Sequence, residues 1–300
     1  MSKLSAPHFH DEEAARVYLQ ALRWPSGPVC AHCGTVNKAY ATKRPGKYRC
    51  ASKECRKDFT VKVGTVFEAS HIPLHKWLLA AYLLCSSKKG ISSHQLMRTL
   101  EVTYKTAWFM THRIREAMRT GAFSPLGGSG QVIEADETYI GRKEGTVARR
   151  GHGHKRAVVT LVERNGEARS FHVDRATIAN VTPIVRKNVS RESLLMTDES
   201  GLYTKLGREF LGHETVNHSA DEYVRGEAHT NTVEGFFSIF KRGFKGIYQH
   251  CGEDHLHRYL AEYDFRYNNR VRFGIGDERR MDIALIQAKG KRLTYRRIGG

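Results

Sequence analysis

Three acidic residues lie within or at the ends of predicted structural elements, where a carboxylate is able to take part in catalysis. Asp136 lies in the alternating, strand-like segment 131–140, Asp198 ends a second apolar run at 193–198, and Glu234 follows after 35 intervening residues in a helical stretch. A charge in such a strand is costly to bury unless it is paired or binds a metal. Carboxylates from separate elements are the ligands with which two Mg²⁺ (or Mn²⁺) ions activate a nucleophile and stabilise a leaving 3′ oxygen. The sequence therefore predicts a two-metal catalytic site.

Several neighbours share the predicted faces of these carboxylates. Glu134 alternates onto the same strand face as Asp136. Asn231 lies three residues before Glu234 on one helical face, and His229 precedes it, either beside the metals or in a structural role. Lys241 follows Glu234 by seven residues, two helical turns on the same face.

Four cysteines have the spacing of a zinc ribbon. Two close pairs are separated by 16 residues, Gly34 follows the first pair as expected for a tight knuckle turn, and several Lys and Arg residues surround them. Four thiolates meet the tetrahedral preference of a structural zinc ion; the alternative is four unrelated thiols. The expected ligands are Cys30, Cys33, Cys50 and Cys55. Cys85 and Cys251 have no such partners and are expected to be buried.

The overall charge favours a polyanionic partner. The chain carries 49 Lys+Arg against 31 Asp+Glu, a formal net charge of +18, and phosphate binding by such a surface releases counterions. Composition alone also fits a basic protein without a nucleic-acid role. The sequence shows neither an apolar run of membrane-spanning length nor a signal-peptide pattern, so a cytosolic, reducing location is expected.

The chain divides into four predicted segments. Residues 1–70 hold the cysteine pairs, 71–123 read as helices, 124–130 form a Gly/Ser linker, and 131–300 have a mixed α/β pattern. Two short helices joined by a turn at 101–103 fit a DNA-binding helix-turn-helix, although a plain helical packing unit has the same pattern. The candidate DNA contacts in this segment are Tyr104, Lys105, Thr106 and Arg113.

The last segment has the element order of an RNase H-like domain. Strands are expected at 131–140, 156–163, 168–173, 193–198 and 214–218, and helices at 176–187, from about 231, and at 254–269. Asn165-Gly166 predicts a type I′ hairpin turn between the second and third strands. The expected fold is thus multi-domain α+β: a small zinc ribbon, a helical segment, and an RNase H-like domain with a mixed five-stranded sheet.

Further stretches along the chain support a family resemblance. They are Cys30-Ala-His-Cys-Gly34, Gly64-Thr-Val-Phe67, Lys89-Gly-Ile-Ser92, Tyr104-Lys-Thr-Ala-Trp108, Glu134-Ala-Asp-Glu-Thr-Tyr-Ile-Gly141, Thr197-Asp-Glu-Ser200, residues 231–242 and Phe265-Arg-Tyr-Asn-Asn-Arg270. Together they resemble the bacterial insertion-sequence transposases of the ISXO type, which join a zinc ribbon to a DDE catalytic domain. The resemblance covers nearly the whole chain.

The resemblance implies a metal site and a DNA contact. Asp136, Asp198 and a third ligand on the helix would hold Mg²⁺, and Lys241, with Arg242 continuing the positive face, would contact DNA. In this group the third ligand can be Asn, so Asn231 remains a neighbouring or substitute ligand; Glu234 is favoured by its spacing to Lys241.

The resemblance also implies an activity and partners. The protein would bind the terminal repeats of its element in the bacterial cytoplasm, at the nucleoid, and would cleave and join double-stranded DNA as a homodimer or larger assembly. Two alternatives remain open: a zinc-ribbon DNA-binding regulator with an inactive catalytic domain, and a structure-specific nuclease of RNase H-like fold.

Overall fold

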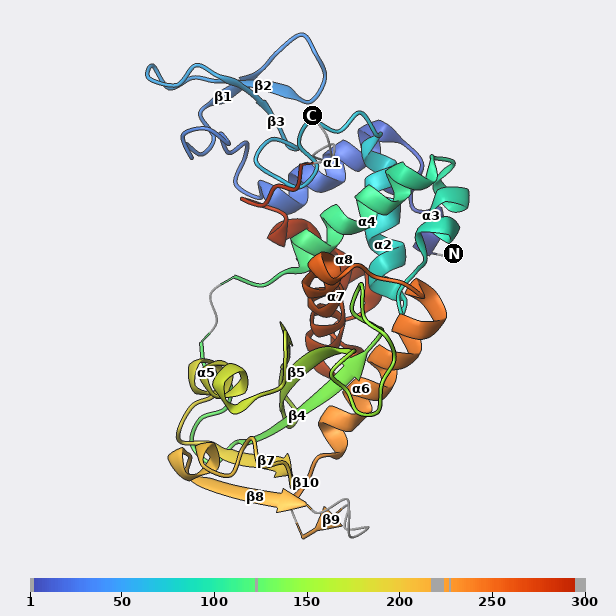
Figure 1. The fold of residues 1–300 in the computed structure, drawn as a ribbon. Helices are drawn as coiled ribbons and strands as arrows, with labels where there is room; N and C mark the ends of the chain where they lie inside the picture. Colours follow the sequence, from blue (N-terminus) through green and yellow to red (C-terminus); the bar gives the residue numbers. More distant parts are fainter. Residues whose placement is uncertain (1–2, 122–123, 217–223, 227, 295–300) are drawn as a thin grey trace. The chain divides into compact units, whose positions relative to one another are not determined.

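The chain folds into two compact units that are not consecutive in sequence. The computed structural model describes residues 3–121, 124–216, 224–226 and 228–294. One unit comprises residues 1–118 with 271–300, and the other comprises residues 119–270 (Figure 1). Residues 271–300, which the sequence analysis grouped with the catalytic domain, therefore belong to the first unit. The reason is apolar packing: helix α8 (Asp277–Gln287) buries Met281, Ala284 and Leu285 and packs against helix α2.

The first unit begins with a helix and a small antiparallel sheet. Helix α1 (Glu12–Arg23) starts at Asp11, whose side chain accepts a hydrogen bond from the Ala14 amide at 2.7 Å. Strands β1 (Ala39–Ala41), β2 (Lys47–Cys50) and β3 (Asp58–Thr60) form a three-stranded sheet. This is the ribbon that the cysteine spacing predicts.

Three further helices complete this unit. Helix α2 (Leu74–Ser86) is buried along most of its length. Helices α3 (Ser93–Leu100) and α4 (Tyr104–Met118) are joined by a short turn in which Glu101 has a φ of 51°. A side chain caps the start of each helix: Ser92 Oγ accepts from the Gln95 amide at 3.1 Å, and Thr103 Oγ1 accepts from the Thr106 amide at 3.2 Å. The local geometry is that of two helices with a three-residue turn.

The second unit has a five-stranded mixed sheet in the order β6-β5-β4-β7-β8. Strands β4 (Val132–Ile140), β5 (Arg156–Glu163) and β6 (Ala168–Val173) are antiparallel, and β7 (Leu194–Asp198) and β8 (Gly212–Val216) run parallel to β4. The strands lie within two residues of the predicted ranges; 217 and 218 lie outside the described residues.

Helices cover both faces of this sheet. Helix α5 (Ile178–Asn188) buries Val181 and Val185 against one face. Helices α6 (Asn231–Gly243) and α7 (Leu256–Asn268) pack their aromatic side chains against the other. A π-helical segment, η5 (Phe244–Tyr248), continues α6, and a short pair, β9 (Val224–Arg225) and β10 (Ala228–His229), precedes it. This arrangement is the RNase H-like fold expected from the element order.

Short 3-10 turns complete both units. They are Lys3–Ser5, Pro7–Phe9, Leu206–Glu209, Glu253–His255 and Val271–Phe273. Among the described residues, no helix combines the length and the apolar character needed to cross a bilayer.

The predicted β5–β6 hairpin forms, but its predicted turn type is wrong. Glu163 pairs with Glu167, which leaves a loop of three residues instead of two. Only Asn165 takes a positive φ, 62°, whereas a type I′ turn needs positive φ at both central residues. The Gly166 amide donates to the Glu163 carbonyl at 2.9 Å and closes the turn.

Candidate active site and zinc centre

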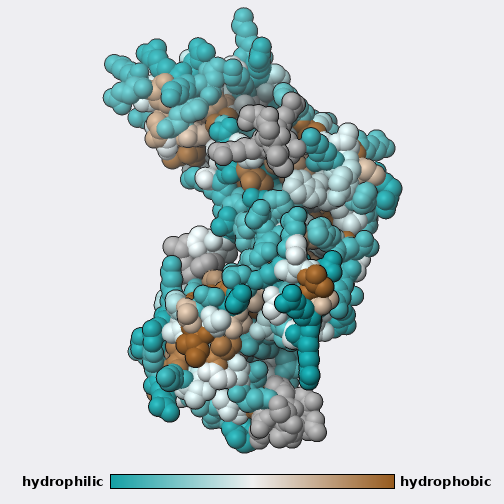
Figure 2. Space-filling view, viewed as in Figure 1, coloured by the Kyte–Doolittle hydropathy of each residue, from teal (hydrophilic) through white to brown (hydrophobic). Residues whose placement is uncertain are grey.

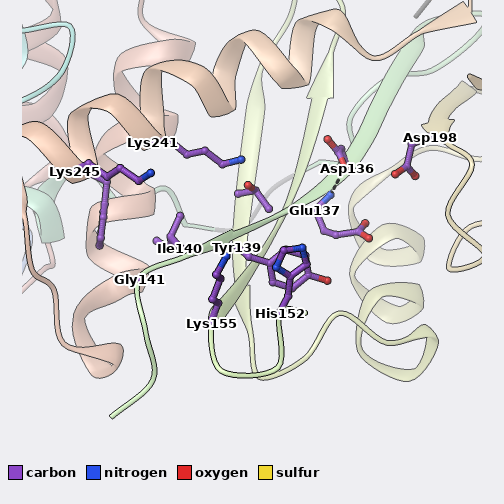
Figure 3. A pocket seen from close by; sticks show the side chains of 12 residues that line it. Asp136, Glu137, Tyr139, Ile140, Gly141, His152, Lys155, Asp198, Lys241 and Lys245 are labelled. Atoms are coloured by element: carbon purple, nitrogen blue, oxygen red, sulfur yellow. Dashed lines mark hydrogen bonds between the residues drawn. The ribbon is translucent and has the colours of Figure 1, made fainter. Parts of the chain in front are cut away.

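The sheet register brings two of the predicted catalytic carboxylates together. Strands β4 and β7 are parallel, with Glu134 opposite Met196, so Asp136 and Asp198 lie level on neighbouring strands, two residues further along each. Figure 3 shows both side chains at one end of a pocket, together with Glu137. Glu234, in the first turn of α6, is close enough for its charge to raise the pKa of Asp136.

Several carboxylates lie close together at this end of the pocket, and their mutual repulsion affects their pKa values. Burial raises the pKa of Asp136 to about 8, and the negative charges of Asp198, Glu137 and Glu234 add to the effect. Burial and Asp198 also raise the pKa of Glu137, whose Oε2 accepts a 3.0 Å hydrogen bond from the hydroxyl of the fully buried Tyr203. A divalent cation relieves such repulsion, and an all-oxygen donor set of this kind suits Mg²⁺.

The raised pKa of Asp136 has a measurable effect on stability without metal. The folded pKa is about 8 and the ordinary value is 3.8, so between pH 4 and 8 the unfolded chain loses a proton that the folded chain keeps. Stability therefore falls as the pH rises through this range. Asp136→Asn removes this cost, and in chelator we expect its melting temperature to exceed that of the wild type by several degrees at pH 8, but by little at pH 4.

A matched substitution separates this effect from a general change of charge. Glu192 is exposed, so Glu192→Gln should leave the pH profile of the melting temperature unchanged. Equal melting temperatures of Asp136→Asn and wild type at every pH would show that Asp136 is not held in a repulsive environment.

Glu134 fastens helix α6 to the sheet. Its side chain is fully buried, and its carboxylate accepts hydrogen bonds from the amides of Thr232 and Val233 at 2.8 and 3.0 Å. These amides belong to the first turn of α6, so Glu134 supplies from the sheet the cap that Thr230 does not provide from its own side chain. The Arg164 guanidinium neutralises Glu134 at 2.7 Å. Glu134 therefore fixes the helix turn that carries Glu234.

The two candidates for the third ligand differ in their surroundings. Glu234 is half-buried and accepts a 2.8 Å hydrogen bond from Thr230 Oγ1. Asn231 is exposed at the first position of α6. The charge of Glu234 contributes to the raised pKa of Asp136, and neither Glu234 nor Asn231 is among the residues that line the pocket, so the identity of the third ligand stays a prediction.

The other end of the pocket is basic. Lys241 and Lys245 line it from α6 and the π-helical segment, and Lys155 lines it from the loop between β4 and β5 (Figure 3). Arg242 is exposed, is not among the pocket-lining residues, and donates from Nε to the Ser238 carbonyl at 3.1 Å. Of the two predicted basic contacts on this helix, Lys241 is thus the one that lines the same pocket as the carboxylates.

The four predicted zinc ligands converge in the first unit. Their sulfur atoms lie within 4.8 Å of one another, with Cys30–Cys55 at 3.7 Å and Cys33–Cys50 at 3.6 Å. Bonds of about 2.3 Å to a tetrahedral zinc ion place sulfurs about 3.8 Å apart. The four thiols therefore fit zinc closely.

The surroundings shift the pKa values of the thiols in opposite directions. A backbone hydrogen bond at Ser52 lowers the pKa of Cys50, but burial and the neighbouring thiols outweigh it and raise that pKa to about 12. The hydroxyl of Thr35, 3.2 Å from the Cys33 sulfur, lowers the pKa of that thiol to about 6. Gly34 and Arg56, which follow the second cysteine of each pair, both have positive φ, so the two knuckles have matching turns. The surface over β1 and β2 is largely hydrophilic (Figure 2). Its exposed basic side chains include Lys43, Arg44, Lys53, Arg56 and Lys57.

Comparison with known proteins identifies the family. Residues 125–268 match the family model described as the ISXO2-like transposase domain, and residues 10–58 match the transposase zinc-ribbon domain. An uncharacterized transposase-like protein of Haemophilus influenzae is 30% identical over 94 residues, which cover 30% of this chain and 72% of that protein. The chain belongs to the ISXO2-like transposase family.

Two further similarities extend over more of this transposase. An uncharacterized protein in the transposable element ISH50 of Halobacterium salinarum is 28% identical over 279 residues, covering 86% of this chain and 91% of that protein. The crystal structure of a pre-cleavage Mos1 transpososome aligns with 68% of this chain and 75% of its own, at 14% identity and a TM-score of 0.27.

The helix-turn-helix residues of this transposase differ in accessibility. Tyr104 is 44% exposed and stacks on His94, and Lys105 is exposed beside it. Thr106 is half-buried, and its hydroxyl lies 2.9 Å from that of Thr103.

Arg113 lies inside the first unit of the transposase. It is 8% exposed and donates to the carbonyls of Leu293 and Glu68 at 3.1 and 3.2 Å. Its guanidinium also lies over the Phe109 ring, 4.8 Å from the centroid. Arg113 is therefore engaged within the protein and does not present its charge to DNA.

Sequence reasoning missed Glu137 and the residue that holds it, Tyr203. Glu137 directly follows Asp136, but strand alternation places it on the opposite face, so a role beside the metal site was not expected. Tyr203, which holds Glu137, carries no local signal because it lies in a loop. His152 and Lys155 belong to the basic stretch 142–156, for which the sequence leaves open a DNA-gripping loop beside the active site or a solvated loop, and Lys245 continues the positive face of the helix. All three line the pocket.

Proposed function

We propose that this transposase binds the ends of its element and catalyses Mg²⁺-dependent DNA cleavage and strand transfer through Asp136, Asp198 and Glu234. The observation that carries the proposal is the level placement of Asp136 and Asp198 on adjacent parallel strands, in a pocket whose other end is basic, with the charge of Glu234 acting on Asp136. Membership of the transposase family supports the same reaction.

The residues have distinct parts in the proposed reaction. Asp136, Asp198 and Glu234 would hold the Mg²⁺ ions, which when bound activate the attacking hydroxyl and stabilise the leaving 3′ oxygen. Lys241 binds the phosphate next to the carboxylates. Glu134 keeps the first turn of α6, and with it Glu234, in register with Asp136. The same groups serve both steps, first with water and then with a freed 3′-OH as the nucleophile.

In the proposed function, the first unit would bind the DNA of the element ends. We propose that the cysteine site holds one structural Zn²⁺ and that the ribbon, with Tyr104, Lys105 and Thr106 at the start of α4, binds the terminal repeats. A dimer or larger assembly is expected because two element ends react together.

The test is an assay with the full chain and duplexes that carry the two boundaries of its own element. With Mg²⁺ we expect nicking at the boundaries and products in which element 3′ ends are joined to target DNA; chelator should abolish both. A duplex of unrelated sequence and a branched four-way junction serve as controls. Cutting of the junction alone would indicate a structure-specific nuclease, and end binding without any product would indicate a DNA-binding regulator.

A further inference from the structure

The loop between β4 and β5 is ordered by its own hydrogen bonds and forms part of the pocket wall. Residues 142–155, here called the basic loop, fold back on themselves: the Lys143 amide donates to the His154 carbonyl at 2.9 Å, and Thr146 Oγ1 donates to the Lys143 carbonyl at 2.7 Å. Lys143 Nζ anchors the loop to Asp174 at 2.6 Å. These contacts bring its last residues to the active-site end of the sheet.

The end of the basic loop presents two groups to the pocket. The Lys155 amide donates to the His152 carbonyl at 2.8 Å, and this tight turn places both side chains on the pocket lining. The His152 ring stacks on Tyr139 of β4, with centroids 4.3 Å apart and planes 16° apart (Figure 3). A cation and a flat aromatic surface therefore lie side by side on this wall.

The facing wall comes from a different part of the chain. Lys241 ends the exposed face of α6 and Lys245 follows one turn later in the π-helical segment, so both line the pocket. The Lys241 ammonium lies 5.8 Å from the centre of the Phe237 ring. π-helical turns commonly occur at functional sites because they re-aim the side chains that follow.

We propose that these two walls form a binding channel for a single DNA strand next to the scissile phosphate, with His152 stacking an unpaired base and Lys155 and Lys245 binding phosphates. The pocket volume, about 780 Å³, lies in the range of sites that enclose small ligands, so the pocket has room for a few nucleotides of one strand. Aromatic faces interleaved with lysines are the general means of binding single strands. The inference rests on the proposed function and adds the form of DNA bound there.

Substitutions of the lysines and of His152 distinguish phosphate binding from base stacking. The probe is a fluorescent oligothymidine that binds the full chain in the absence of Mg²⁺, measured over a range of salt. Lys155→Ala and Lys245→Ala should each weaken binding about three- to tenfold and reduce the slope of log affinity against log salt by about 0.7. His152→Ala should weaken binding about tenfold without changing that slope. His152→Tyr, which keeps an aromatic ring at this position, should bind the oligonucleotide as tightly as the wild type does.

The matched control is Lys187→Ala, the same charge change on an exposed residue of α5, which covers the other face of the sheet. Crosslinking of a 5-iodouracil oligonucleotide to the peptide that contains His152 is the second readout. If Lys155→Ala and Lys245→Ala match Lys187→Ala and the crosslink lies elsewhere, the channel is overturned, while boundary cleavage by the wild type keeps the proposed function. Loss of boundary cleavage and end binding in the wild type itself would instead overturn the proposed function.

Discussion

Asp198→Asn is expected to abolish strand cleavage and strand transfer while leaving binding of the element ends unchanged. The substitution removes one of the two level carboxylates and with it a charge that Mg²⁺ needs, but it keeps the shape of the end of β7. We expect a fall of about three orders of magnitude in the cleavage rate, equivalent to about 4 kcal/mol of transition-state stabilisation.

The same variant should respond differently to metal. Wild-type protein should melt at a higher temperature when Mg²⁺ is added, because an ion that binds only the folded state stabilises it. Asp198→Asn should lose most of this increase. Glu199→Gln, an identical change at the exposed neighbouring residue, serves as the control for both readouts. Undiminished cleavage by Asp198→Asn would remove Asp198 from the catalytic set.

Removal of zinc is expected to unfold the ribbon and to abolish binding of the element ends. The three strands of the ribbon are short, three or four residues each, and Cys50 is 1% exposed at the end of β2. Structural zinc sites contribute on the order of 10 kcal/mol to folding, more than so small a sheet supplies alone. We therefore expect one zinc per chain by elemental analysis, and loss of both zinc and end binding in Cys50→Ser.

Cys85→Ala tests whether this effect is specific to the four ligands. Cys85 is fully buried in α2 and lies outside the cluster, so the variant should keep one zinc even if its melting temperature falls. Less than half a zinc per chain in the wild type, together with normal folding of Cys50→Ser, would contradict the assignment. Mg²⁺-dependent cleavage of non-specific DNA should persist without zinc, because its proposed ligands belong to the other unit.

The parts of the molecule that could be predicted are those with a local chemical signature. Two cysteine pairs have few uses in a reducing compartment, so the ribbon followed from spacing. A charge within an apolar strand also has few explanations, and Asp136 and Asp198 are indeed level in the sheet. Strand alternation and a crossover helix predicted the five strands of the sheet and their order along the chain.

The remainder depends on contacts between distant segments. Glu134 caps a helix almost 100 residues away, and nothing near it in sequence indicates this partner. Arg113 lies among polar residues in the sequence, which predicts an exposed side chain. In the structure its guanidinium is buried and donates hydrogen bonds to the carbonyls of residues 68 and 293. The basic loop has no periodicity, and its place at the pocket depends on the contact of Lys143 with Asp174 and on the stack of His152 on Tyr139.

The return of α8 to the first unit sets an order for folding during synthesis. The ribosome releases residues 119–270 before α8 emerges, so the catalytic sheet can close while the first unit still lacks the helix that covers α2. A message cut short after residue 270 would thus yield a complete sheet attached to an open helical unit with buried apolar side chains exposed. Chains that expose such apolar surface are prone to aggregation and proteolysis. A nonsense mutation late in the coding sequence is therefore expected to silence the protein even though it spares every proposed metal ligand.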